Sequence, residues 1–183
     1  MHVGANNEAI AALPYYHVED PSENREVKSN ELKVHGNTRT YNLNSLLAQN
    51  IMNSEYFKEL QEIESFLDTV DEIYNRCSHV APWAVGTSRI PSSAFCLLMK
   101  LFVLRVTKKQ MYTLLNHPDS PYIRALGFLY LRYTCPPKEL WGWFEQYLDD
   151  QEEIKPCPDA SLMTMGQFVV KLIKEMQVWR GLC

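Results

Sequence analysis

One stretch decides the fold: residues 116–134, which read NHPDSPYIRALGFLYLRYT. Its first residues are typical of a turn, and Ser120 followed by Pro121 fits an N-cap and the first position of a helix. From Pro121 to about Tyr133 nearly every side chain is apolar or aromatic. A helix that is apolar nearly all round is buried, so this segment predicts a central helix. Gly127 in its middle predicts close approach of a neighbouring helix.

Amphipathic segments flank this helix on both sides. Helices are predicted where apolar residues recur every three or four positions. These segments are residues 43–52 with Asn42 as N-cap, 55–76, 93–106, 108–115 and 137–148, followed by a last helix that starts at a capping box of Thr164 and Gln167. Residues 154–163 hold two short apolar pieces that predict a small β-hairpin. The fold class is therefore all-α, a compact single domain of six or seven helices with at most one hairpin.

The periodicity also predicts which aromatic and leucine residues of two helices face the core. In residues 55–76 the spacing places Leu67 and Tyr74 on the apolar face, opposite a row of acidic residues. In residues 137–148 it places Trp141 and Phe144 toward the core and leaves Trp143 off that stripe.

Length and composition indicate one soluble globular domain with an extension. The chain has 183 residues and a net charge of −4, which argues mildly against a phosphate-binding protein. Residues 1–35 lack apolar periodicity and are predicted to form a weakly ordered N-terminal arm, which leaves residues 36–183 as the helical domain. The five cysteines are scattered and predict reduced thiols. No signal peptide and no apolar stretch long enough to cross a membrane are expected.

The sequence contains no motif for catalysis or for cofactor binding. Neither G-x-G-x-x-G nor G-x-x-x-x-G-K-[ST] occurs. Cys77 and His79 are two potential ligands, where a zinc site uses three or four. Cys135 has no base close in sequence, and His117 with Asp119 fits the turn before the central helix. We therefore predict no catalytic residue, no metal and no cofactor, and a metal-dependent or cysteine enzyme is an alternative.

Charge is distributed unevenly along the chain. Residues 100–132 carry six basic side chains and one acidic side chain, and residues 139–153 are strongly acidic. Opposite charges on two surfaces favour steered protein association. The basic set also supports an alternative, a helical domain that binds RNA directly. Its members are Lys100, Arg105, Lys108, Lys109, Arg124 and Arg132.

Several ordered strings resemble the pre-mRNA-processing factor 38 family. The most specific is DSPYIRALGFLYLRYT at residues 119–134. Others lie on either side of it: AFCLLMKLF at 94–102, LWGWFE at 140–145, LDD at 148–150 and MTMG at 163–166. The resemblance spans about residues 36–180 and is nearest to the branch labelled 38B.

This resemblance implies a fold and a function. The family's domain is mostly α-helical, serves as a platform for other splicing proteins and is not known for enzyme activity. A non-enzymatic protein-interaction scaffold of the spliceosome is therefore expected, in the nucleus, acting in pre-mRNA splicing and in spliceosome maturation or activation. The partners implied are other spliceosomal proteins, in the tri-snRNP or the precatalytic spliceosome.

The partner surface is predicted around the helix at residues 137–148 and the acidic run after it. Rigid helical platforms bind helical or extended segments in their grooves. Trp143 is the predicted anchor, because a large ring off the core stripe can fill a partner's pocket. Tyr122 and Arg124 are predicted to border the same groove, since a short proline turn should hold the central helix alongside. The carboxylates predicted to attract a basic segment are Asp149, Asp150, Glu152 and Glu153.

Overall fold

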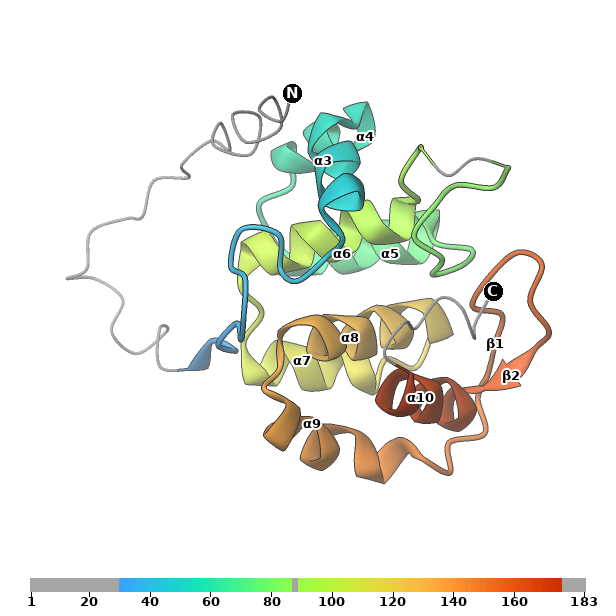
Figure 1. Ribbon diagram of the computed structural model, residues 1–183. Helices are drawn as coiled ribbons and strands as arrows, with labels where there is room; N and C mark the ends of the chain where they lie inside the picture. Colours follow the sequence, from blue (N-terminus) through green and yellow to red (C-terminus); the bar gives the residue numbers. More distant parts are fainter. Residues whose placement is uncertain (1–29, 87–88, 176–183) are drawn as a thin grey trace, which may run out of the picture. The chain divides into compact units, whose positions relative to one another are not determined.

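The structure is a computed structural model that describes residues 30–86 and 89–175 (Figure 1). The chain divides into two units, Met1–Asn30 and Glu31–Cys183, and the second contains the helical domain. Its α-helices are α3 (Ser45–Asn53), α4 (Glu55–Glu59), α5 (Phe66–Arg76), α6 (Ser93–Leu104), α7 (Lys108–Leu115), α8 (Pro121–Thr134), α9 (Pro137–Phe144) and α10 (Met165–Lys174). Two short 3-10 helices, η1 (Leu60–Glu62) and η2 (Glu145–Tyr147), follow α4 and α9. The all-α prediction is confirmed.

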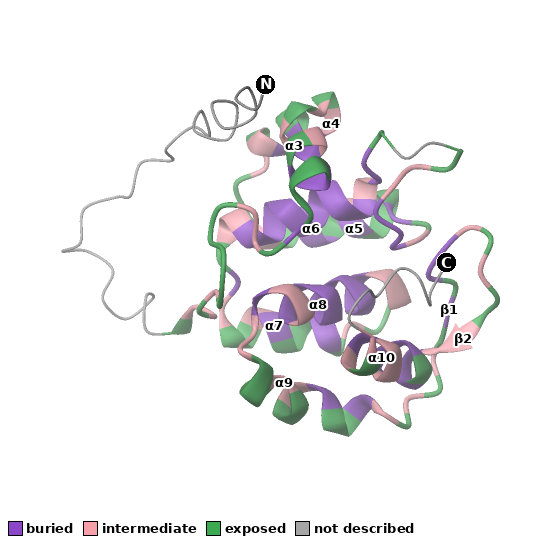
Figure 2. Cartoon of the chain, in the orientation of Figure 1, coloured by how far each residue is buried: buried purple, intermediate pink, exposed green. Residues whose placement is uncertain are grey.

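Helix α8 is the centre of the domain, as residues 116–134 predict. It packs against α5, α6, α7, α9 and α10, and ten of its fourteen residues are buried, which is why it is purple along most of its length in Figure 2. It begins as expected, because the Ser120 hydroxyl accepts a hydrogen bond from the Tyr122 amide at 3.2 Å and Pro121 occupies the first turn. A Cβ added at Gly127 would lie 3.0 Å from Leu114, so the predicted close approach is that of α7.

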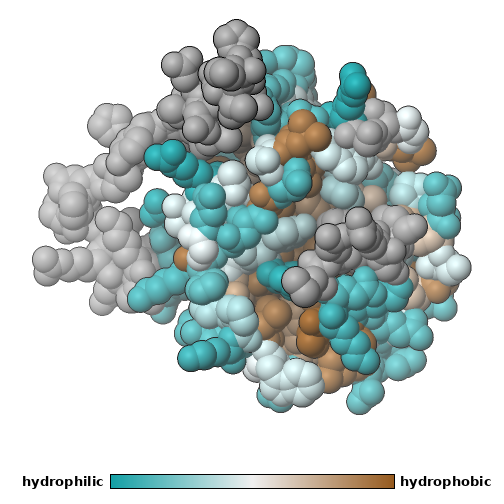
Figure 3. All heavy atoms as spheres, viewed as in Figure 1, coloured by the Kyte–Doolittle hydropathy of each residue, from teal (hydrophilic) through white to brown (hydrophobic). Residues whose placement is uncertain are grey.

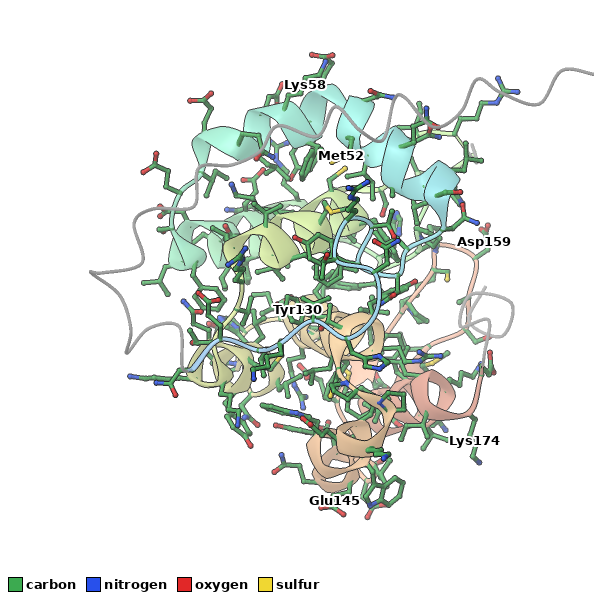
Figure 4. The ribbon with its side chains drawn as sticks, turned by 60° about the vertical axis from the view of Figure 1, so that its left-hand side comes forward. Met52, Lys58, Tyr130, Glu145, Asp159 and Lys174 are labelled. Atoms are coloured by element: carbon green, nitrogen blue, oxygen red, sulfur yellow. The ribbon has the colours of Figure 1, made fainter. Side chains whose placement is uncertain are left out.

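A second buried helix, α6, lies against α8 and α5. The rings of Phe102 in α6 and Tyr130 in α8 are 5.0 Å apart, and both side chains are fully buried. Figure 4 shows Tyr130 in the interior, whereas Lys58, Glu145 and Lys174 lie at the outside. Helices α6 and α8 therefore form the two-helix core that the outer helices cover.

The single long helix predicted at residues 55–76 is wrong, because the chain folds there as α4, η1 and α5. Ile63 is extended after η1, and Ser65 caps a new helix by accepting a hydrogen bond from the Asp68 amide at 3.0 Å. The break changes the phase of the helix, so Leu67 and Tyr74 are 68% and 57% exposed instead of facing the core. The break also divides one predicted helix into two. The described residues therefore contain eight α-helices, whereas six or seven were expected.

Asn42 does not cap α3, and Asn44 does so instead, with its Oδ1 3.0 Å from the Leu46 amide. Asn42 has a positive φ of 61°. Its Nδ2 donates to the carbonyl oxygens of His35 and Tyr133, each at 2.7 Å. Asn42 therefore ties the segment before α3 to the end of α8.

Residues 31–35, predicted to belong to the N-terminal arm, lie along the helical domain. The Leu32 amide donates to the Val106 carbonyl at 3.0 Å, and the His35 amide donates to the Thr134 carbonyl at 2.8 Å. Residues 1–29 lie outside the described residues, so the arm remains a prediction.

The small hairpin between α9 and α10 is confirmed. Strand β1 (Glu153–Ile154) pairs antiparallel with β2 (Met163–Thr164), and Ile154 lies opposite Met163. Helix α10 then begins at the predicted capping box, with the Thr164 hydroxyl accepting from the Gln167 amide at 3.2 Å. Within the described part of the chain, no helix is long and apolar enough to cross a membrane.

Candidate protein-interaction site

Helix α9, predicted to carry the partner surface, is the most exposed of the later helices. Only Phe144 is buried, with its ring edge-on to Phe128 at 5.4 Å. Trp141 was predicted to face the core as well, and this is wrong, because its side chain is 54% exposed. Trp141 therefore lies on the outer flank of α9.

Trp143 is half-buried and leans on the neighbouring helix α7. Its ring centroid is 4.9 Å from that of Tyr112, at an interplanar angle of 38°, and Tyr112 is itself 49% exposed. We call this pair the Tyr112–Trp143 seam. A partly exposed aromatic pair combines a large apolar area with few rotatable bonds. Such a pair is suited to binding a partner.

Arg124, predicted to border the partner groove, is buried and bound to the chain itself. Its Nε donates to the Leu115 carbonyl at 2.7 Å, and its two terminal nitrogens form ion pairs with Asp150 and Glu152. The guanidinium carbon also lies 5.8 Å from the centre of the Tyr147 ring. We call this arrangement the Arg124 clamp, and it holds the segment after η2 against α8.

The clamp changes the electrostatics of the predicted acidic run. Burial acts to raise the pKa of Asp150, but hydrogen bonds from Arg124 outweigh it and hold that pKa below its usual 3.8. Asp150 and Glu152 are thus paired inside the domain, whereas Asp149 and Glu153 are exposed. Only these last two remain as carboxylates for steering.

Tyr122 and Trp143, predicted to border one groove, lie in different helices, α8 and α9, and both are partly buried against the core. Burial raises the pKa of Tyr122, and the charge of Cys77 at the end of α5 raises it further. Trp143 contacts α7.

The basic residues behind the RNA-binding alternative are not all available to a phosphate backbone. Lys100 is 4% exposed, and burial lowers its pKa. Arg132 donates from Nε to the Leu172 carbonyl at 2.8 Å, and Arg124 forms the clamp. Lys108 and Lys109 are exposed at the start of α7.

The residues weighed for an enzyme or metal site are in ordinary packing environments. Burial raises the pKa of Cys77 to about 12 and that of Cys135 to about 11, so both are protonated thiols at neutral pH. His79 Nδ1 accepts from the Ala81 amide at 3.2 Å, and His117 Nδ1 accepts from the Asp119 amide at 3.3 Å. No group of three metal-ligating side chains forms among residues 30–86 and 89–175.

The expectation of reduced thiols needs a correction at one position. Cys157 is disulfide-bonded, whereas Cys77, Cys96 and Cys135 are free. The spacing of the cysteines in the sequence does not indicate a bond at Cys157.

A hollow of about 260 Å³ beside α5 was not predicted from the sequence. It opens between α5 and the turn that joins α7 to α8. The signal that could have revealed it is Ser65, because a second N-cap there predicts the phase change that turns Tyr74 outward. The lining residues are Val70, Asp71, Tyr74, His117, Asp119 and Ile123.

Comparison with known proteins defines the class to which this helical domain belongs. The family model described as PRP38 family matches residues 32–181. The chain therefore belongs to the PRP38 family, as the resemblance of residues 119–134 and their neighbours indicated.

Individual relatives agree with this assignment. The chain is 48% identical to Arabidopsis thaliana pre-mRNA splicing factor SR-like 1, over 77% of this chain and 36% of that protein. It is 42% identical to human pre-mRNA-splicing factor 38B, over 82% of this chain and 31% of that protein. The chain thus spans about a third of the length of these two curated relatives. With the Xenopus laevis 38A protein the identity is 26%, over 85% of this chain and 50% of that protein, so the 38B branch is confirmed.

A solved structure matches the fold. It is the crystal structure of the Snu23–Prp38–MFAP1(217–258) complex of Chaetomium thermophilum, with a TM-score of 0.69 and 26% identity. The match covers 79% of this chain and 76% of that chain.

Proposed function

We propose that the chain is a non-enzymatic protein-interaction scaffold of the spliceosome. The observation that carries this proposal is the family match over residues 32–181, which includes every described helix. Relatives named as pre-mRNA splicing factors support a role in splicing, in spliceosome maturation or activation, and therefore in the nucleus. The high pKa of the Cys77 and Cys135 thiols weighs against the cysteine-enzyme alternative.

The proposed partners are other spliceosomal proteins, bound through helical or extended segments. The related Prp38 chain was crystallised with Snu23 and with a short MFAP1 segment, residues 217–258. Within this proposal, a partner segment of similar length would dock as a helical or extended peptide. Counterparts of these two proteins are the first candidates, within the tri-snRNP or the precatalytic spliceosome.

The proposed contact surface is the Tyr112–Trp143 seam. Tyr112 is half-exposed and Trp143 is partly exposed, and both come from helices that pack against α8, so a partner would meet a preformed surface. Asp149 and Glu153 are the exposed carboxylates that would speed the approach of a basic segment. Within this proposal, Arg124, Asp150 and Glu152 stabilise the fold, because they satisfy one another.

The test is a pull-down from nuclear extract with the chain as bait, read by mass spectrometry. Wild type should recover counterparts of Snu23 and MFAP1 together with other splicing proteins. Tyr112→Ala should lose them while remaining folded, because Tyr112 is half-exposed. Leu162→Ala is the matched control: it also removes a half-exposed apolar side chain, 57% exposed, from the hairpin loop.

The outcomes test the proposed function and the proposed contact surface separately. If wild type recovers no splicing protein, the proposed function is wrong. If folded Tyr112→Ala and Trp143→Ala variants retain the partners at wild-type levels, the function stands and the seam is not the contact. Recovery that disappears on nuclease treatment would favour the RNA-binding alternative.

A further inference from the structure

The hollow beside α5 combines an apolar floor with acidic walls. Val70 and Ile123 are 5% and 0% exposed and form its base. Asp71 and Asp119 are exposed carboxylates, and within the described residues neither has an ion-pair partner. Tyr74 lines the same hollow with a ring that is 57% exposed.

The outer face of α5 extends this surface. Leu67, Asp71 and Tyr74 stand at positions i, i+4 and i+7, so they share one side of the helix. Leu67 is 68% exposed. Teal and brown residues alternate over the face seen in Figure 3, so apolar side chains between polar ones are common on this domain. On the α5 face, such side chains lie beside a hollow lined by two exposed carboxylates.

We propose that this hollow receives an arginine side chain from a basic segment of a partner protein. The guanidinium would lie near Asp71 and Asp119 and against the Tyr74 ring, and the aliphatic part would pass over a floor where Val70 and Ile123 expose almost no surface. Arginine fits better than lysine, because a planar, weakly hydrated guanidinium stacks on an aromatic face and bonds two carboxylates at once.

The spacing on α5 indicates what the rest of the segment presents. Leu67 and Tyr74 are seven residues apart, about 10 Å along the helix axis at 1.5 Å per residue. A partner helix lying along α5 would place an apolar residue on Leu67 and its arginine in the hollow, two turns away. This site is separate from the Tyr112–Trp143 seam and does not depend on the proposed role in splicing.

The probe is an alanine-based helical peptide with a leucine and an arginine seven residues apart. It is titrated into the ¹⁵N-labelled full chain and followed by amide chemical shifts. Shifts are expected in Leu67–Tyr74 and His117–Ile123. A matched peptide with citrulline in place of arginine keeps the shape without the charge and should bind about tenfold more weakly, as expected for one lost charge-assisted pair.

Variants locate the binding to the two carboxylates. The double variant Asp71→Asn, Asp119→Asn should weaken binding of the arginine peptide about tenfold or more. Asp159→Asn removes another exposed carboxylate, in the hairpin loop, and should leave the affinity unchanged. Melting curves of all three proteins should coincide, because none of these carboxylates is in an ion pair among the described residues.

Several results would overturn the proposal. Wild type that binds neither peptide, equal binding of the arginine and citrulline peptides, or shifts confined to α9 would each do so. So would unchanged affinity of the double variant. Calcium ions that produce the same shifts at lower concentration than the peptide would identify a cation site instead.

Discussion

Helices α8 and α9 are neighbours that share a proline start and a high aromatic content but differ in their surroundings. Both begin with proline in the first turn, and both are rich in aromatic residues. Yet α8 buries ten of fourteen residues and α9 one of eight. The difference lies in the number of helices that pack against each: α8 contacts five others, while α9 lies on the edge. Aromatic content therefore indicates burial only when other elements are available to cover it.

The comparison also separates two uses of aromatic side chains. Phe128 and Tyr130 in α8 fill the core. In α9, Trp141 is 54% exposed and Trp143 is only partly buried against the core, whereas Phe144 is fully buried. Large rings left at a surface are typical of contact sites, which is why α9 and its neighbour α7 carry the proposed seam.

The sharpest test of this contrast lies within α9 itself. Phe144→Ala should lower the free energy of unfolding by about 3–5 kcal/mol, because it empties a fully buried site. Trp141→Ala should change it by less than about 0.5 kcal/mol, although the side chain removed is larger. Urea denaturation measures both. Similar losses in the two variants would mean that α9 is packed as α8 is.

The Arg124 clamp gives the next largest effect. Arg124→Met should cost about 3 kcal/mol, because Asp150 and Glu152 would remain partly buried without their counter-ion. Arg105→Met is the control, since Arg105 is 60% exposed and 4.0 Å from Glu31, and it should cost less than about 1 kcal/mol. A clamp variant as stable as the control would show that the ion pairs add nothing.

Two glycines offer a matched pair of smaller changes. Gly142→Ala in α9 should stabilise the domain by about 0.5–1 kcal/mol, because an added Cβ there meets nothing within 4 Å and alanine favours helix. Gly127→Ala in α8 should destabilise it by about 1 kcal/mol, because the Cβ would lie 3.0 Å from Leu114 and Leu115. Thermal unfolding should shift in opposite directions. Melting-temperature shifts of the same sign would show that the two glycines do not differ in how closely they are packed.

An effect of similar size is a dependence of stability on pH. The folded pKa of Asp150 lies below its ordinary value of 3.8, so the stability that its pairing adds is fully present above that value and is lost as pH falls through the folded pKa. Wild type should therefore exceed Asp150→Asn by a constant margin of about 1 kcal/mol at pH 5–7, and the margin should shrink below pH 4. A margin that persists at low pH would mean that the carboxylate charge is not its cause.

Local signals in the sequence were sufficient for much of the fold. The start of α8 follows from Ser120 and Pro121, and the start of α10 follows from Thr164 and Gln167, because a cap is formed by residues within one turn of one another. The hairpin near residues 154–163 was predicted from two short apolar pieces that lie close together in the sequence.

Features that depend on distant partners were not predicted. The counter-ions of Arg124 lie 26 and 28 residues away, and no periodicity connects them. The break before α5 was missed because apolar spacing continues through it, although Ser65 is an N-cap residue at which a new helix can begin. Of the two rings in the candidate site, the sequence therefore predicted only Trp143. The contact between Trp143 and Tyr112 was found in the structure.

The Arg124 clamp has a consequence for the order in which the protein is made. A ribosome adds about 5–20 residues per second from the N-terminus. Helix α8 is therefore synthesised before Asp150 and Glu152, and also before the Leu172 carbonyl that Arg132 binds. Until residues 150–175 have emerged, Arg124 lacks its two counter-ions and Arg132 lacks its carbonyl partners. The nascent domain should accordingly complete its folding late, after translation of α10, with α8 exposed to chaperones until then.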